Sequence, residues 1–227
     1  MKRFYDTVSV ERAENGWSVA LDGRAVRTQG GNSQTVPSAA LADLLAAEWR
    51  DQGDEIDPRA FPMRDMADYA IDVIAAHPDA AIGKLLAYAE TDTLCYRADP
   101  EEALWRRQQE VWEPLVTAME AREGVRLERV SGVIHRAPKP ETLAALRARL
   151  ERLDPFHLAA LETLTALPAS LCIGLGALEP GADGEALWDA ANLEEDWQAE
   201  RWGVDEEAAA RRRKRREAFL AAMRFAR

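Results

Sequence analysis

Residues 8–28, VSVERAENGWSVALDGRAVRT, alternate apolar and polar side chains with the two-residue period of half-buried β-strands. The alternation is interrupted at Asn15-Gly16 and at Asp22-Gly23, and both dipeptides favour the positive φ angles of tight hairpin turns. Gly23 is therefore expected to be a structural residue of its turn. The segment predicts a short antiparallel meander, which is marginally stable alone and needs a covering element.

A helix directly after the meander is the expected cover. Pro37-Ser38 is typical of a helix start, and Gly53 is typical of a stop. Between them the apolar residues recur at helical spacing: Leu41, Leu44, Leu45 and Trp49. We expect Trp49 to be structural and to pack against the sheet. Residues 1–58 thus predict a small β-rich domain with one covering helix.

Beyond Pro58 the strand pattern nearly disappears, and residues 59–227 predict a larger all-helical domain. Pro114 lies inside one expected helix, so a kink or a break is expected there. Residues 125–138 are expected to hold one short extended stretch. The fold class is therefore α+β. The expected helices cover about 62–77, 82–89, 100–123, 140–153, 156–178, 184–202 and 205–225.

Composition narrows the class of protein. The 227 residues carry a formal net charge of −11, which argues against a general nucleic-acid or anionic-membrane binder. No segment approaches the roughly 20 apolar residues of a membrane span, and the N-terminus has no hydrophobic signal core. Cys95 and Cys172 lie among apolar residues and are expected to be buried, reduced thiols. We expect a cytoplasmic protein.

The segment WDAANLEEDWQAERWG, residues 188–203, carries an anomaly. On a helical wheel, Leu187, Ala190, Leu193 and Trp197 share one broad apolar face, and Glu194 falls in the middle of it. Glu195 lies at the edge of that face. A carboxylate inside an apolar stripe must find a donor, change its pKa or meet a partner.

Recognisable catalytic chemistry is sparse. His77, His135 and His157 are far apart, and none has a His or Cys at metal-ligand spacing, so no metal and no cofactor is expected. Ser170, Cys172 and the glycines of residues 173–181 are expected to serve helix packing and helix ends. The basic run at residues 211–216 is expected to pair within the protein or to be solvated on a helix surface.

Two classes of function remain open from the residues. A small hydrolase or transferase could use Glu194 and Glu195 as acid and base in a helical cleft. A binding protein or a structural adaptor fits better, because the chain has seven tryptophans, a residue type enriched at interfaces, and no set of catalytic residues beside the glutamates.

The sequence also resembles a known family, the ATP synthase F(1) complex assembly factor 2 family. The matching blocks follow the family's order along nearly the whole chain. They are RFYDTVSV (3–10), VALDGRAVRT (19–28), VPSAALADLLAAEW (36–49), Gln52, AIDV (70–73), YAETDTLCYRA (88–98), QQEVWEPL (108–115) and LEEDWQAERWGVDEEA (193–208).

The resemblance implies an ATP-independent chaperone, not an enzyme. Its partner would be the free alpha subunit of the ATP synthase catalytic head, whose beta-contacting surface it would shield. It also implies a bacterial, cytoplasmic member that is monomeric when free; organellar relatives act in the mitochondrial matrix. Candidate partner-binding residues in the matching blocks are Glu194, Glu195, Trp197, Trp202, Asp92 and Trp112.

Overall fold

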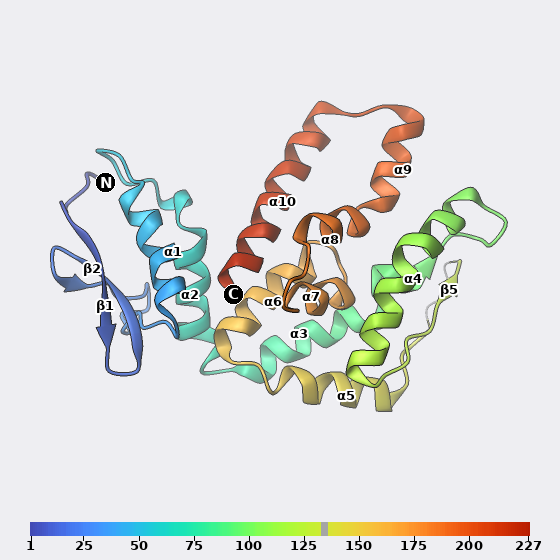
Figure 1. Cartoon of the computed structure of the whole chain (residues 1–227), viewed down its shortest axis with the longest axis horizontal. Coiled ribbons are helices and arrows are strands. Elements are labelled where there is room, and N and C mark those ends of the chain that lie inside the picture. The colour runs from blue at the N-terminus through green and yellow to red at the C-terminus, as the bar shows by residue number, and fades with distance from the viewer. Residues whose placement is uncertain (133–135) are drawn as a thin grey trace.

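The computed structural model of the chain describes residues 1–132 and 136–227, and its class is α+β as predicted (Figure 1). The strands are β1 (Val8–Ala13), β2 (Gly16–Leu21), β3 (Arg24–Ala25), β4 (Tyr96–Arg97) and β5 (Val130–Ser131). The helices are α1 (Ala39–Arg50), α2 (Pro62–Tyr69), α3 (Pro78–Glu90), α4 (Ala103–Glu123), α5 (Pro140–Leu150), α6 (Pro155–Ala166), α7 (Leu171–Ala177), α8 (Gly184–Ala191), α9 (Leu193–Trp202) and α10 (Glu206–Phe225).

The predicted meander is a three-stranded antiparallel sheet in the order β1-β2-β3. Asp22 (φ 48°) and Gly23 (φ 75°) form the turn between β2 and β3 with the positive φ angles of a tight hairpin. The first turn differs from the prediction, because Ala13 pairs with Gly16 and Gly16 already belongs to β2. A Cβ at Gly16 would lie 2.3 Å from the Val36 carbonyl oxygen, so close backbone approach demands this glycine.

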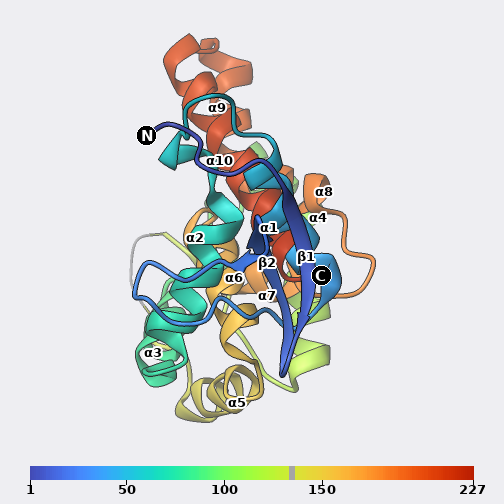
Figure 2. The ribbon, with the colours of Figure 1, turned by 90° about the vertical axis from the view of Figure 1, so that its left-hand side faces the viewer.

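Helix α1 covers the sheet, as Figure 2 shows with the strands in front. It begins at Ser38, whose hydroxyl accepts a hydrogen bond from the Leu41 N–H at 3.1 Å. Trp49 is buried between Tyr5 and Phe61, with ring centroids 5.6 and 4.6 Å away. Trp49 therefore packs among aromatic rings in the core of this region.

Glu48 connects α1 to the start of α2. Its carboxylate accepts hydrogen bonds from the backbone N–H groups of Met63 at 2.6 Å and Arg64 at 2.9 Å. Both N–H groups belong to the first turn of α2, where no helical carbonyl can pair with them. Burial raises the pKa of Glu48 to about 7, although the two hydrogen bonds oppose this shift. The domain boundary near residue 58 stays a prediction.

A test of Glu48 follows from this pKa. An acid whose pKa is higher in the folded than in the unfolded state takes up its proton at a higher pH when folded. Protonation therefore stabilises the folded state. Its stabilising contribution is therefore full below the ordinary value of 4.5 and is lost as the pH rises to about 7. Urea unfolding of the wild type and of Glu48→Gln between pH 4.5 and 8 should show the wild type losing stability relative to the variant. Parallel pH profiles would contradict this expectation.

The helical region is divided more finely than predicted. The helix expected over 156–178 is two helices, α6 and α7, because Ala169 after Pro168 has a φ of +52° and Ser170 starts α7 as its N-cap. The helix expected over 184–202 also breaks, at Asn192, where φ is −104° and ψ is 16°. Helix α4, in contrast, continues through Pro114, so the break expected there is not observed.

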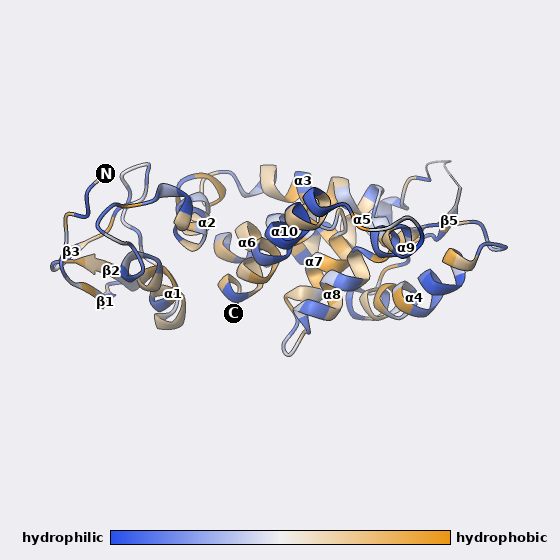
Figure 3. Cartoon of the chain, turned by 90° about the horizontal axis from the view of Figure 1, so that it is seen from above, coloured by the Kyte–Doolittle hydropathy of each residue, from blue (hydrophilic) through white to orange (hydrophobic). Residues whose placement is uncertain are grey.

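Residues 125–138 contain β5, which confirms the short extended stretch predicted there. Its partner was not predicted: β4 pairs with β5 in parallel, with Tyr96 opposite Val130. Cys95 and Cys172 are buried and free, as expected. Figure 3 shows hydrophobic residues gathered along α6 and α7 in the middle of the molecule. Within residues 1–132 and 136–227 no helix is long and apolar enough to cross a membrane.

Candidate functional site

Helices α9 and α10 form a hairpin that projects from the helical body, with its turn at the upper edge of Figure 1. Gly203, at φ +90°, ends α9. Trp202 and Val204 flank this glycine and are 78% and 70% exposed. Neighbouring large apolar side chains at this exposure are typical of interaction sites, and tryptophan is a frequent interface anchor. The hairpin tip is therefore the first candidate for an interaction surface.

Charged contacts hold α9 between its neighbours. The guanidinium of Arg212 on α10 binds the carboxylate of Asp196 through both nitrogens, and Arg107 on α4 binds Glu200 at 2.8 Å. Trp197 lies half-buried under the guanidinium of Arg201, whose carbon is 4.5 Å from the ring centroid. Ion pairs thus connect α9 to α10 on one side and to α4 on the other.

Part of the basic run on α10 pairs within the protein, while Arg213 and Lys214 are exposed to solvent. Arg212 pairs with Asp196, and Arg216 pairs with Glu185 of α8. Arg211 pairs with Glu207 one turn earlier on the same helix.

Glu194 is half-buried and tied to α4. Its Oε1 accepts a hydrogen bond from Gln108 Nε2 at 2.6 Å, and Gln108 Oε1 accepts from the Ala98 N–H at 2.9 Å. Burial raises the pKa of Glu194, while the bond from Gln108 opposes the rise. The carboxylate on the apolar face has therefore found a donor, whereas its neighbour Glu195 is exposed to solvent.

Asp92 and Trp112 are in the core, contrary to the expectation that they contact a partner at the surface. Asp92 is 1% exposed and accepts hydrogen bonds from Leu94 N–H, Ser170 Oγ and Cys172 N–H at 3.1, 2.7 and 2.8 Å. Trp112 is 0% exposed and donates from Nε1 to the Ala190 carbonyl at 2.6 Å. A direct contact with either side chain would require the core to open.

Sequence reasoning missed Gln108 and Val204. A sequence signal for Gln108 existed, because it precedes Trp112 by four residues and so lies on the same face of α4. Val204 follows the helix stop Gly203, and an isolated valine in a turn carries no periodic pattern. Only the exposure of the folded chain singles it out.

The remaining candidate residues have structural positions. His157 Nδ1 lies 2.7 Å from Asp154 Oδ2, and His77 is exposed before α3; His135 lies outside the described residues. Gly174 packs against α6, where a Cβ would meet Thr165 Oγ1 at 2.3 Å. No three His, Cys, Asp or Glu side chains of the described part of the chain form a group that could hold a metal ion.

Glu194→Ala should lower the free energy of unfolding by about 1–3 kcal/mol, because it leaves the buried Gln108 amide without its acceptor. Glu194→Gln keeps an oxygen at that place and should cost about 1 kcal/mol or less. Urea unfolding followed by circular dichroism measures both. If alanine and glutamine are equally tolerated, the contact with Gln108 contributes nothing to stability.

The α+β fold thus carries two exposed apolar side chains at one tip, an arrangement that is common in protein–protein contact surfaces. Comparison with known proteins makes the class specific. The chain belongs to the ATP12 chaperone protein family, whose profile matches residues 2–120. This confirms the resemblance seen in the sequence.

The relatives extend the match over the whole chain. Two solved structures of Atp12 from Paracoccus denitrificans, one of them of a point mutant, are 40% identical to this chain and superpose with a TM-score of 0.93. They cover 99% of this chain, which covers 96% and 97% of theirs. The mitochondrial protein atp12 of Schizosaccharomyces pombe is 26% identical over 219 residues, 91% of this chain and 75% of that protein.

Proposed function

We propose that the chain is an ATP-independent assembly chaperone of the ATP synthase. It binds the free alpha subunit of the catalytic head and shields the surface that later contacts beta. It catalyses no reaction and acts in the bacterial cytoplasm. Membership of the ATP12 chaperone family supports the class, and the exposed tip at Trp202 and Val204 is the observation that supports a client-binding surface.

The chemistry of the hairpin suits such a client. A surface destined for a subunit interface is apolar with charged edges. Trp202 offers a large apolar anchor, and exposed Glu195 on the same helix offers negative charge. The net charge of −11 would speed encounter with a client face that carries basic residues.

Co-expression with the alpha subunit alone tests this proposal. The wild-type chain should keep alpha soluble and co-purify with it, while Trp202→Ser should reduce co-purification about tenfold or more, as expected for an interface tryptophan. Val73→Ser is the matched control, because Val73 is an exposed apolar residue away from the hairpin.

Trp202→Ser should unfold at the wild-type temperature, because Trp202 is 78% exposed, and Val73→Ser should lower it only slightly, because Val73 is 45% exposed. Unchanged solubility of alpha with and without the wild-type chain would refute the function. Equal losses for Trp202→Ser and Val73→Ser would refute the role of the hairpin tip.

A further inference from the structure

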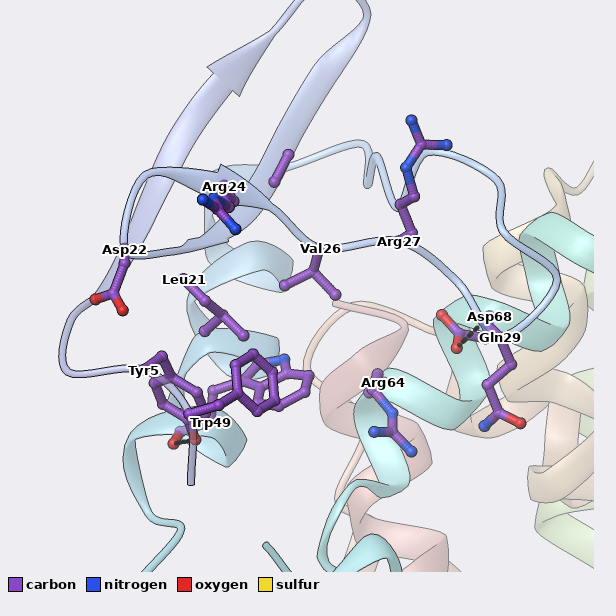
Figure 4. Close-up of a pocket in the computed structure, with 12 residues that line it drawn as sticks. Tyr5, Leu21, Asp22, Arg24, Val26, Arg27, Gln29, Trp49, Arg64 and Asp68 are labelled. Atoms are coloured by element: carbon purple, nitrogen blue, oxygen red, sulfur yellow. Dashed lines mark hydrogen bonds between the residues drawn. The ribbon is translucent and has the colours of Figure 1, made fainter. Parts of the chain in front are cut away.

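A second concave surface lies at the other end of the molecule. A pocket of about 630 Å³ opens between the N-terminal segment, β3 and the helices α1 and α2 (Figure 4). Its apolar wall is formed by Tyr5, Leu21, Val26 and Trp49. Phe4 also lines it and is 62% exposed. The pocket is large enough for one or two apolar side chains.

An open sheet edge runs along this pocket. Residues 24–27 line it one after another, and β3 is the last strand of the order β1-β2-β3. Val26 N–H bonds the Val19 carbonyl at 2.8 Å, whereas Ala25 lies opposite Ala20. Because hydrogen-bonded and non-bonded pairs alternate in antiparallel sheets, the N–H and C=O of Ala25 point away from β2. Such an edge can pair with another extended chain.

Arginines surround the pocket although the protein is strongly acidic. Arg24, Arg27 and Arg64 all line it (Figure 4). Arg24 is exposed, and its guanidinium makes no hydrogen bond within residues 1–132 and 136–227. It interacts electrostatically with Asp22, but its N–H donors are unused and can pair with a carboxylate brought by a ligand.

The two carboxylates beside the arginines are already occupied. Asp22 accepts hydrogen bonds from the backbone N–H and the hydroxyl of Thr7 at 2.8 and 2.9 Å. Asp68 accepts from Gln34 Nε2 at 2.5 Å and from the Gln29 N–H at 3.0 Å. Arg27 donates to the Gly31 carbonyl and Arg64 pairs with Asp65, both at 2.8 Å, so the unused donors that a ligand would meet belong to Arg24.

One further donor is unused at this place. The indole N–H of Trp49 is buried in the pocket wall without an acceptor in the described part of the chain. A buried donor without an acceptor is destabilising. A small shift of the wall on binding would let an oxygen of the ligand reach it.

We propose that this pocket binds an extended, acidic and aromatic segment of a protein partner by strand addition to β3. The segment pairs with the backbone of Ala25, places a large apolar side chain on Leu21 and Trp49, and brings a carboxylate to Arg24. This pocket, called the groove below, is a second docking surface in addition to the hairpin tip. It depends on the proposed function only for the identity of the partner.

Fluorescence anisotropy with a labelled peptide tests the groove without the client. The probe is an eight-residue peptide in which every second residue alternates between phenylalanine and glutamate, with threonine between them, and the full-length chain should bind it in the micromolar range. Arg24 lies opposite Leu21 and shares its face of the sheet, so this spacing presents both kinds of side chain to the pocket. A peptide with lysine in place of glutamate should bind at least about tenfold more weakly, a difference of about 1.4 kcal/mol. The glutamate peptide with N-methyl groups on alternate residues should also lose affinity, because it cannot pair with β3.

Protein variants locate the site. Arg24→Glu should weaken binding about fivefold or more through loss and reversal of one charge, and Ala25→Pro should weaken it by removing the outward N–H. Arg213→Glu, an exposed arginine on α10, is the matched control and should bind like the wild type. Melting curves report whether each variant folds. The N-methylated peptide tests strand addition even if Ala25→Pro does not fold.

Two results would overturn the proposal. One is the absence of saturable binding by the wild type at peptide concentrations up to about 1 mM. The binding free energy would then be weaker than about −4 kcal/mol. The other is equal affinity of wild type and Arg24→Glu together with full binding of the N-methylated peptide. Trp202→Ser should retain peptide binding although it loses the client. Failure of the proposed function, measured by co-purification, is therefore distinguishable from failure of the groove, measured by peptide binding.

Discussion

Replacing Trp112 by alanine should lower the free energy of unfolding by about 3–5 kcal/mol, the cost of removing a large aromatic side chain from a packed core. Trp112 is fully buried, and its indole N–H donates to the Ala190 carbonyl at 2.6 Å. That carbonyl lies at the C-terminal end of α8, where helical partners run out. The substitution therefore removes both the core packing of the Trp112 ring and its hydrogen bond to the end of α8.

Trp112→Phe separates these two contributions. It keeps most of the buried ring but loses the donor, so it should cost about 1–2 kcal/mol for the hydrogen bond, together with a smaller packing loss. Urea unfolding monitored by far-ultraviolet circular dichroism is the appropriate measurement, because tryptophan fluorescence changes with the substitution itself. A cost below about 1 kcal/mol for Trp112→Ala would show that Trp112 is not a core residue in solution.

Replacing Asp92 by alanine should be similarly damaging, by about 3 kcal/mol or more, because buried donors lose their acceptor together. The donors are the N–H groups of Leu94 and Cys172 and the hydroxyl of Ser170. They belong to the turn before β4 and to the start of α7, so Asp92 fastens segments 78 residues apart. Burial raises the pKa of Asp92, and the hydrogen bonds it accepts counteract that rise.

Asp92→Asn should give an intermediate loss. Its amide keeps one oxygen for Leu94 and Ser170, but the new NH₂ group faces the N–H of Cys172, so one donor stays unpaired. Asp43→Ala is the control, since Asp43 is exposed and has only a weak ion pair with Arg50 at 3.9 Å; it should cost about 0.5 kcal/mol or less. Equal stability of Asp92→Ala and Asp43→Ala would contradict the structure.

These substitutions also bear on the proposed client surface. Asp92→Ala and Trp112→Ala should reduce binding only in proportion to the fraction of unfolded protein. Trp202→Ser should reduce binding without any loss of stability. The difference separates residues that build the fold from residues that meet the partner, although all three lie in segments that resemble the same family.

The sequence predicted the elements whose causes lie within a few neighbouring residues. Alternation over residues 8–28 predicted the sheet, the turn glycine Gly23 was identified from its dipeptide, and Ser38 and Trp49 marked the start and the buried face of α1. Periodicity alone did not find the break at Asn192, because apolar residues continue on the same face across it. The pairing of β4 with β5 was also hidden, since two-residue strands carry no pattern.

Exposure was decided by the tertiary structure. Glu194 and Trp202 lie on one helix and were equal candidates from the sequence, yet one is half-buried against α4 and the other projects into solvent. The partners that bury Glu194 and Trp112 are 86 and 78 residues away along the chain. A local pattern determines where a helix or a tight hairpin forms, because the backbone hydrogen bonds of both join residues that are close in the sequence. Whether a polar or aromatic side chain is a core residue or a contact for a partner depends on these distant neighbours, and folding alone brings them together.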